Sequence, residues 1–68
     1  MKLYEIKLPA KIYCKVSDGS TFVICDHLDG MYSYCSTEKD PEGKTPFHLS
    51  VSTPLRMRDD GYEIDNSV

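Results

Sequence analysis

Three cysteines and two histidines have the most distinctive chemistry in this chain: Cys14, Cys25, Cys35, His27 and His48. Zinc accepts thiolate and imidazole ligands in structural sites, so Cys14, Cys25, His27 and His48 form a weak candidate metal set. The chain has no C-x-x-C knuckle, however, and C-x-H is an unusual ligand spacing. We therefore expect no metal and no other cofactor. A zinc-stabilised structural domain is our second alternative hypothesis.

A nucleophilic pair of cysteine and histidine is the second chemistry that these residues offer. Cys25 and His27 are two positions apart, so on a strand their side chains stand side by side rather than pointing into a cleft. No oxyanion loop or orienting acid accompanies them, and the four glycines are expected in turns, not in a phosphate-binding loop. We therefore predict a protein that is not an enzyme and has no catalytic residues.

The number of cysteines favours free thiols. Three cysteines are an odd number, and their positions, 14, 25 and 35, fit no disulfide framework. Reduced thiols are typical of the cytosol. Near the N-terminus, Glu5 and Lys7 interrupt the apolar core that a signal peptide needs. No stretch approaches the roughly 20 apolar residues of a membrane span. We expect a cytoplasmic protein that has no membrane association.

Length and charge exclude several classes of function. The chain has 68 residues, of which 40% are hydrophobic, enough for one small core. A protein of this size buries only about 60% of the surface that its unfolded chain exposes, so no interior remains for a large cofactor. Eight basic and eleven acidic residues give a net charge of −3. That charge disfavours binding to duplex DNA, because domains that bind duplex DNA usually have a basic excess.

Short β-prone runs, cut by Gly, Pro and Asp, predict an all-β fold. The runs cover residues 2–8, 10–17, 20–28, 31–36, 47–53 and 55–65. We predict one domain over residues 1–68: a small five- to six-stranded antiparallel meander curled into a half-open barrel, SH3-like or OB-like. That comparison concerns architecture only. The polar segment 37–46, TEKDPEGKTP, is expected to form an exposed loop.

Three Asp-Gly pairs determine the expected strand register: Asp18-Gly19, Asp29-Gly30 and Asp60-Gly61. Each pair can occupy the two positive-φ positions of a type I′ turn, which connects paired strands through a two-residue loop. Loop length fixes register. The pairings that follow include Ile12 with Cys25, Ile24 with Cys35, and Arg56 with Asp65.

Basic and aromatic residues alternate along the second predicted strand. Lys11, Tyr13 and Lys15 share one side of it, next to Phe22 and Ile24 across the hairpin. Aromatic rings flanked by lysines hold single-stranded nucleic acid in small barrels. Because the net charge opposes this role, a small barrel that binds single-stranded nucleic acid is our first alternative hypothesis.

Tyrosines favour a protein partner. They are five of the seven aromatic residues, and tyrosine is enriched at protein interfaces. A small sheet that is partly apolar on both faces leaves a surface for another chain. We therefore predict a protein-interaction module, a small regulator or inhibitor that binds a protein partner or itself as a homo-oligomer. The expected binding residues are Lys11, Tyr13, Lys15, Phe22, Ile24, Met31 and Cys35.

Overall fold

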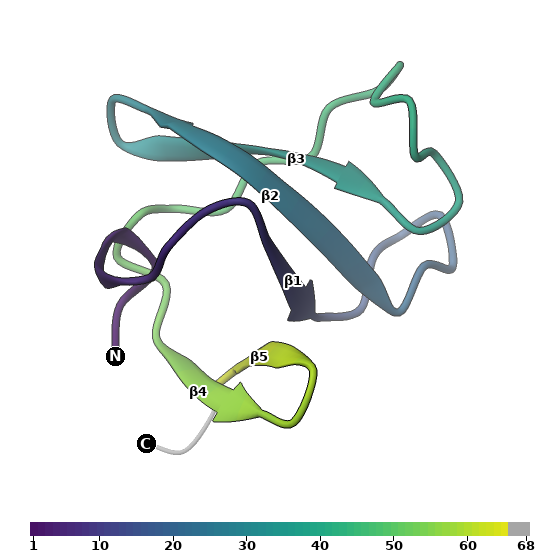
Figure 1. Cartoon of the computed structure of the whole chain (residues 1–68). Helices are drawn as coiled ribbons and strands as arrows, with labels where there is room; N and C mark the ends of the chain where they lie inside the picture. The colour runs from purple at the N-terminus through teal and green to yellow at the C-terminus, as the bar shows by residue number, and fades with distance from the viewer. Residues whose placement is uncertain (66–68) are drawn as a thin grey trace.

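The computed structural model describes residues 1–65, which form five β-strands and one turn of 3-10 helix (Figure 1). In chain order the elements are η1 (Leu3–Glu5), β1 (Ala10–Tyr13), β2 (Phe22–Asp29), β3 (Tyr32–Thr37), β4 (Leu55–Arg58) and β5 (Gly61–Ile64). No α-helix occurs in residues 1–65, so the all-β prediction is confirmed. Nothing in this part of the chain is a helix long and apolar enough to cross a membrane.

The strands form one mixed sheet in the order β3-β2-β1-β5-β4. The pairs β1–β2, β2–β3 and β4–β5 are antiparallel, whereas β1 and β5 are parallel. The prediction of an antiparallel meander is therefore wrong in one respect. The chain leaves β3 at one side of the sheet and returns on the other side of β1, so β5 joins β1 in the parallel direction (Figure 1). The sheet is not closed into a barrel.

Residues 47–51 run along the edge of β3 that does not pair with β2, and they do not form a regular strand. Backbone hydrogen bonds link Phe47 to Cys35 and Leu49 to Ser33, and isolated bridges replace the strand expected over residues 47–53. The strand expected over residues 2–8 is also absent, because residues 3–5 turn into η1. The N-terminal segment instead hydrogen-bonds to residues 51–55.

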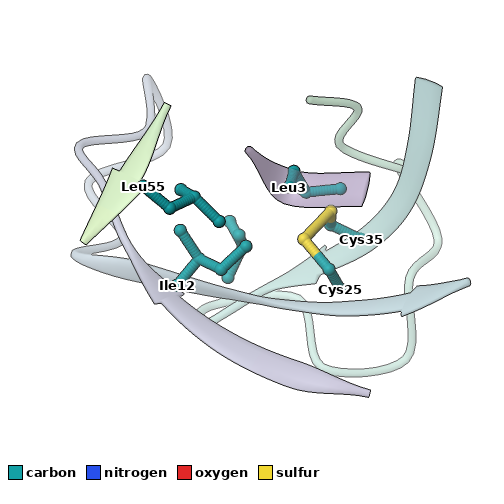
Figure 2. Packing of buried hydrophobic residues seen from close by; sticks show 6 residues of the cluster. Leu3, Ile12, Cys25, Cys35 and Leu55 are labelled. Carbon is teal, nitrogen blue, oxygen red and sulfur yellow. A yellow bond between two sulfur atoms is a disulfide. The ribbon is translucent and has the colours of Figure 1, made fainter. Parts of the chain in front are cut away.

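The core lies on one face of the sheet, which we call the inner face. Its buried side chains are Leu3, Ile12, Val23, Cys25, Cys35 and Leu55, several of which are labelled in Figure 2. They come from η1 and from four of the five strands, so the core joins the two ends of the chain to the sheet centre. Half-buried apolar residues from the connecting segments pack around this cluster.

A β-bulge in β2 decides which residues reach the inner face. Cys25 pairs with Cys35 and His27 pairs with Tyr34, so the register shifts between Cys25 and His27 and Asp26 is the extra residue. An extra residue in one strand reverses the sides on which the following residues lie. Cys25 and Cys35 therefore point into the core. The predicted pairing of Ile24 with Cys35 is wrong, because Ile24 pairs with Ser36.

The other two registers differ from the prediction by two residues. Ile12 pairs with Val23 rather than Cys25, because residues 14–21 form a wider connection in which Gly19, at φ +92°, has the positive φ. In the last hairpin Arg56 pairs with Glu63 rather than Asp65, because Asp59 and Asp60 form the loop and Gly61 belongs to β5. The middle loop is Gly30-Met31, with Gly30 at φ +64°.

Gly61 occupies a position in β5 at which the parallel neighbouring strand, β1, approaches closely. A Cβ at this position would lie 2.5 Å from the carbonyl oxygen of Lys11 on β1. Real Cβ atoms do not approach backbone oxygens so closely, so any larger residue would push β5 away from β1.

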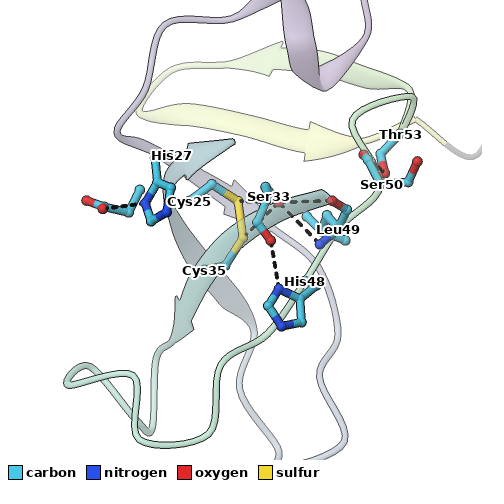
Figure 3. Close-up of a disulfide and its surroundings, with 9 residues drawn as sticks. Cys25, His27, Ser33, Cys35, His48, Leu49, Ser50 and Thr53 are labelled. Atoms are coloured by element: carbon cyan, nitrogen blue, oxygen red, sulfur yellow. Dashed lines mark hydrogen bonds and ion pairs between the residues drawn. A yellow bond between two sulfur atoms is a disulfide. The ribbon is translucent and has the colours of Figure 1, made fainter. Parts of the chain in front are cut away.

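A disulfide joins Cys25 and Cys35 inside the core (Figure 3). Cys14 is the free thiol. The prediction of three free thiols is therefore wrong for Cys25 and Cys35. Odd cysteine counts exclude complete pairing, but they do not exclude one bridge between two residues that the sheet places opposite each other. The prediction of a cytoplasmic location loses the support of free thiols and stays untested.

Reduction of the disulfide is expected to lower the free energy of unfolding by about 3 kcal/mol, because the bridge closes a loop with a sequence separation of 10. Urea unfolding of oxidised and reduced protein measures this difference. The oxidised native protein should show a single thiol of slow reactivity, because burial raises the pKa of Cys14. Three reactive thiols before any reductant is added would contradict the bridge.

Gly61→Ala is expected to lower the free energy of unfolding by about 2–3 kcal/mol, because the added methyl group collides with the Lys11 backbone. Gly30→Ala is the matched control. It has open space at its Cβ but a positive φ, so it should cost only about 1 kcal/mol. Equal losses in urea unfolding would show that β5 does not need this close approach to β1.

Candidate interaction face

The opposite side of β1, β2 and β3 carries half-buried and exposed aromatic, apolar and basic side chains, and we call it the outer face. Its residues alternate with the buried residues of the core: Lys11, Tyr13, Phe22, Ile24, His27 and Tyr34. Ile24, on the interior strand β2, is 36% exposed, and Tyr34, on the edge strand β3, is 37% exposed. The outer face therefore offers apolar surface that the core does not use.

A cluster of rings and cations occupies one end of the outer face. Tyr13 and Phe22 are directly opposed on β1 and β2, and their ring centres are 6.1 Å apart. The Lys11 Nζ lies 4.8 Å from the centre of the Tyr13 ring and 4.4 Å from that of Phe22. The guanidinium carbon of Arg58, from β4, lies 4.0 Å from the centre of the Tyr13 ring. Cation–π attraction thus holds two positive charges close to the ring of Tyr13.

Asp60 neutralises part of this cluster. The Tyr13 hydroxyl donates a hydrogen bond to Asp60, and the Lys11 Nζ lies 3.5 Å from the same carboxylate. The hydrogen bond from Tyr13, with a smaller effect of Lys11, lowers the pKa of Asp60. The pKa of Lys11 is raised, chiefly through the Tyr13 hydroxyl and also through Asp60. The β4–β5 loop is therefore tied to β1 through side chains.

A row of three rings crosses the other end of the outer face. His27 stacks on Tyr34 with ring centres 5.0 Å apart and an interplanar angle of 12°. His48 comes from the segment along the other edge of β3. Its ring centre lies 4.7 Å from that of Tyr34, and the interplanar angle is 86°. The side chain of Asp26 lies 3.0 Å from the His27 Nδ1. This row extends the outer face onto residues 47–51, beyond the edge of the regular sheet.

Buried contacts hold His48 in place. Its Nδ1 lies 3.0 Å from the carbonyl oxygen of Ser33, and because a carbonyl only accepts, this nitrogen is the donor (Figure 3). Ser33 is fully buried, and its hydroxyl donates to the carbonyl oxygen of Leu49 and accepts from the Leu49 N–H. The same hydroxyl lies 3.2 Å from the Cys35 sulfur. The position of an exposed ring thus depends on the core.

Two hollows open beside this row of rings. The first, of about 320 Å³, lies between the outer face and the loop that follows β3, and Pro41 and Pro46 line its loop side. Asp40 orders this loop, since its carboxylate accepts hydrogen bonds from the N–H groups of Lys44 and Thr45. The second, of about 250 Å³, is lined by four residues near the β2–β3 turn: Asp29, Tyr32, Tyr34 and His48.

The structure brings together four of the seven predicted binding residues: Lys11, Tyr13, Phe22 and Ile24. Lys15 lies beyond the end of β1, and Met31 lies at the tip of the β2–β3 turn, where it is 73% exposed. Cys35 is buried and bonded to Cys25, so its assignment to the binding face is wrong. The bulge in β2 is the physical reason, because it shifts the register so that Cys35 lies opposite the inward-pointing Cys25 instead of Ile24.

The residues proposed for metal binding or nucleophilic chemistry do not gather. Within residues 1–65, no group of three or more His, Cys, Asp or Glu side chains could hold a metal ion. The sulfur of Cys25 is used by the disulfide, and the bulge places His27 on the outer face, away from Cys25. The expectation that the side chains of Cys25 and His27 stand side by side is therefore wrong.

Sequence reasoning missed Tyr34 as a member of the outer face, and it missed Arg58 and Asp60 as residues that contact this face. Arg58 and Asp60 reach Tyr13 only because β5 joins β1 in parallel, and no local pattern in the sequence signals that pairing. For Tyr34 a signal existed, because Tyr32 and Tyr34 alternate with Ser33 and Cys35 along β3. That alternation predicts that both tyrosines lie on one side and both small residues on the other.

Comparison of the chain with protein-family models, with curated proteins and with solved structures finds no match.

Tyr13→Phe is expected to raise the pKa of Asp60 toward the ordinary carboxyl value, because it removes the hydrogen bond that lowers it most. A lowered carboxyl pKa stabilises the fold above the unfolded-state pKa, and this contribution is lost as the pH falls through the folded-state value. In the variant this contribution should be smaller, and its loss should be complete at a higher pH. Carboxyl ¹³C NMR titration measures the midpoint, with Tyr62→Phe as the control. Identical midpoints in wild type and Tyr13→Phe would contradict the contact.

Proposed function

We propose that this protein is a non-enzymatic interaction module that binds a protein partner through the outer face. The observation that carries the proposal is that the two sides of the sheet have different roles. One side contains the whole core, whereas the other presents Tyr13, Phe22, Ile24 and Tyr34 without needing them for that core. Apolar surface of this kind on a small protein marks a site for another molecule.

The chemistry of the face favours a protein over other partners. Tyr and Arg are the residue types that dominate the energetics of protein interfaces, and Tyr13 and Arg58 are already in contact. Charges of both signs surround the apolar residues, since Lys11 and Arg58 are accompanied by Asp26 and Asp60. A balanced rim around an apolar centre is typical of protein interfaces.

Single-stranded nucleic acid is the second candidate ligand. Two cations beside adjacent aromatic rings, at Lys11, Arg58, Tyr13 and Phe22, form the combination on which bases stack in small barrels. Asp60 reduces the positive field of this cluster, and the net charge of −3 opposes a polyanion. We therefore rank this function below protein binding. The zinc-stabilised domain gains no support from residues 1–65.

We propose that the open sheet, with residues 47–51 along β3, corresponds to a small half-open barrel of the SH3-like or OB-like kind. In that setting the protein acts as a small regulator or inhibitor in the cytoplasm, bound to its target or to a second copy of itself.

Tyr13→Ala combined with Phe22→Ala is expected to weaken partner binding tenfold or more, because truncation of central interface aromatics commonly costs that much. The matched control is Tyr4→Ala with Met57→Ala, at residues that are 59% and 70% exposed and lie outside the outer face. Quantitative affinity capture from the source cells, followed by mass spectrometry, compares the three proteins. Light scattering at micromolar concentration tests self-association with the same set.

The proposal requires that wild type and control retain the same protein, or form the same oligomer, and that the face variant does not. Equal capture by all three proteins would contradict the outer face as the binding surface. Capture of no protein, together with a monomeric state and loss of retention on oligo-dT only in the face variant, would assign the face to nucleic acid.

A further inference from the structure

The smaller hollow on the outer face has the composition of a cation site. Its lining consists of Asp29, Tyr32, Tyr34 and His48, so three of its four residues carry aromatic rings and the fourth is an acid. With a volume of about 250 Å³ it fits a small head group rather than a drug-sized ligand.

The strand register explains why these four residues meet. Asp29 is paired with Tyr32 across β2 and β3, and Tyr34 follows Tyr32 by two positions on the same side of β3. Isolated bridges pair Tyr32 with Ser50 and Cys35 with Phe47, which sets His48 opposite Tyr34. The hollow is therefore a product of backbone pairing on both edges of β3.

The rings form walls that face different directions. Tyr34 and His48 are nearly perpendicular, at 86°, with centres 4.7 Å apart. Stacking of His27 braces Tyr34, and the hydrogen bond to the Ser33 carbonyl braces His48. Tyr32, 57% exposed, adds a third ring beside them. Rings at several orientations around one space can surround a ligand cation with their electron-rich faces.

Asp29 supplies a negative charge that nothing neutralises. Within residues 1–65, its carboxylate has no ion pair and no hydrogen-bond partner, and no lysine or arginine lines the hollow. This contrasts with Asp60, whose charge Lys11 and Tyr13 already engage. A carboxylate that lines an aromatic hollow and has no partner there favours a positively charged ligand.

We propose that this hollow binds a quaternary ammonium group. Such a group has a diffuse positive charge and no N–H donor, so it gains from aromatic faces and a nearby carboxylate without needing hydrogen bonds. A free choline-like molecule and the trimethylated lysine side chain of a protein present this same chemistry. The site is separate from the Tyr13 cluster, and it does not depend on the protein-binding role proposed above.

A titration of the full chain with tetramethylammonium chloride, followed by ¹H–¹⁵N NMR, tests the site. The amide signals of residues 29–34 and 48 should shift in a saturable way with a millimolar dissociation constant. Sodium chloride at equal ionic strength controls for salt. Choline and its uncharged isostere 3,3-dimethyl-1-butanol are then compared, and choline should bind about fivefold more tightly or better, because only it carries the charge.

Two variants make the test specific to this hollow. Tyr32→Ala and Asp29→Asn should each weaken tetramethylammonium binding about fivefold, because each removes one attractive wall or charge. Tyr4→Ala and Asp59→Asn make the same chemical changes elsewhere and should leave binding unchanged. Well-dispersed spectra of all four variants show that the fold is intact.

Three results would overturn the proposal: no saturable shift at residues 29–34 and 48, equal binding of choline and its neutral isostere, or unchanged binding by both hollow variants. A further titration distinguishes the two sources of the ligand. Tighter binding of a short peptide containing trimethyllysine than of choline would assign the site to a modified protein. The reverse order would assign it to a free small molecule.

Discussion

The fold depends on a core that occupies only one side of a single sheet and is closed by the bridge between Cys25 and Cys35. A chain of this length buries too little apolar surface to rely on burial alone, and small domains commonly add a covalent link for that reason. Here the link joins the two strands that carry the row of rings on their other side. The contacts that stabilise the inner face therefore also hold the outer face in shape, and the Ser33 hydroxyl, close to the Cys35 sulfur and bonded to Leu49, makes that coupling direct.

The extra residue in β2 is what gives the two faces different chemistry. Before the bulge, Cys25 points inward, and after it His27 points outward to stack on Tyr34. Without the bulge, an uninterrupted alternation would have put Cys25 and His27 on the same side, as the sequence pattern suggests. One inserted residue thus separates a sulfur pair that belongs to the core from rings that belong to the surface. Bulges commonly re-aim side chains in this way next to functional sites.

The errors of the sequence reasoning follow from the period of a strand. All-β structure, most strand positions and the inward orientation of Ile12 and Val23 could be predicted, because alternation and turn residues are local signals. The two registers that slipped by two residues still kept each side chain on its correct side, so the Arg56 pair remained an opposite-charge pair. Beyond the bulge, the observed register differs from the prediction by one residue. A difference of an odd number of residues moves a side chain to the other face, and this misplaced Cys35. The parallel pairing of β1 with β5, and with it the contact of Arg58 with Tyr13, depends on the path of the whole chain and has no local signature.

The two ends of the outer face differ in how far their charges are already satisfied. At the Tyr13 end, the cations and the carboxylate of Asp60 engage one another, so a ligand there must compete with contacts that the protein makes by itself. Such a cluster orients an aromatic ring and contributes shape more than net charge. At the Asp29 end, rings surround a space next to a carboxylate without a counter-charge among residues 1–65, so an incoming cation gains attraction without displacing an internal partner. Free energy of binding comes from interactions that the unbound protein does not already have. By that reasoning we propose that the Tyr13 end determines which surfaces fit, and that the Asp29 end selects for positive charge.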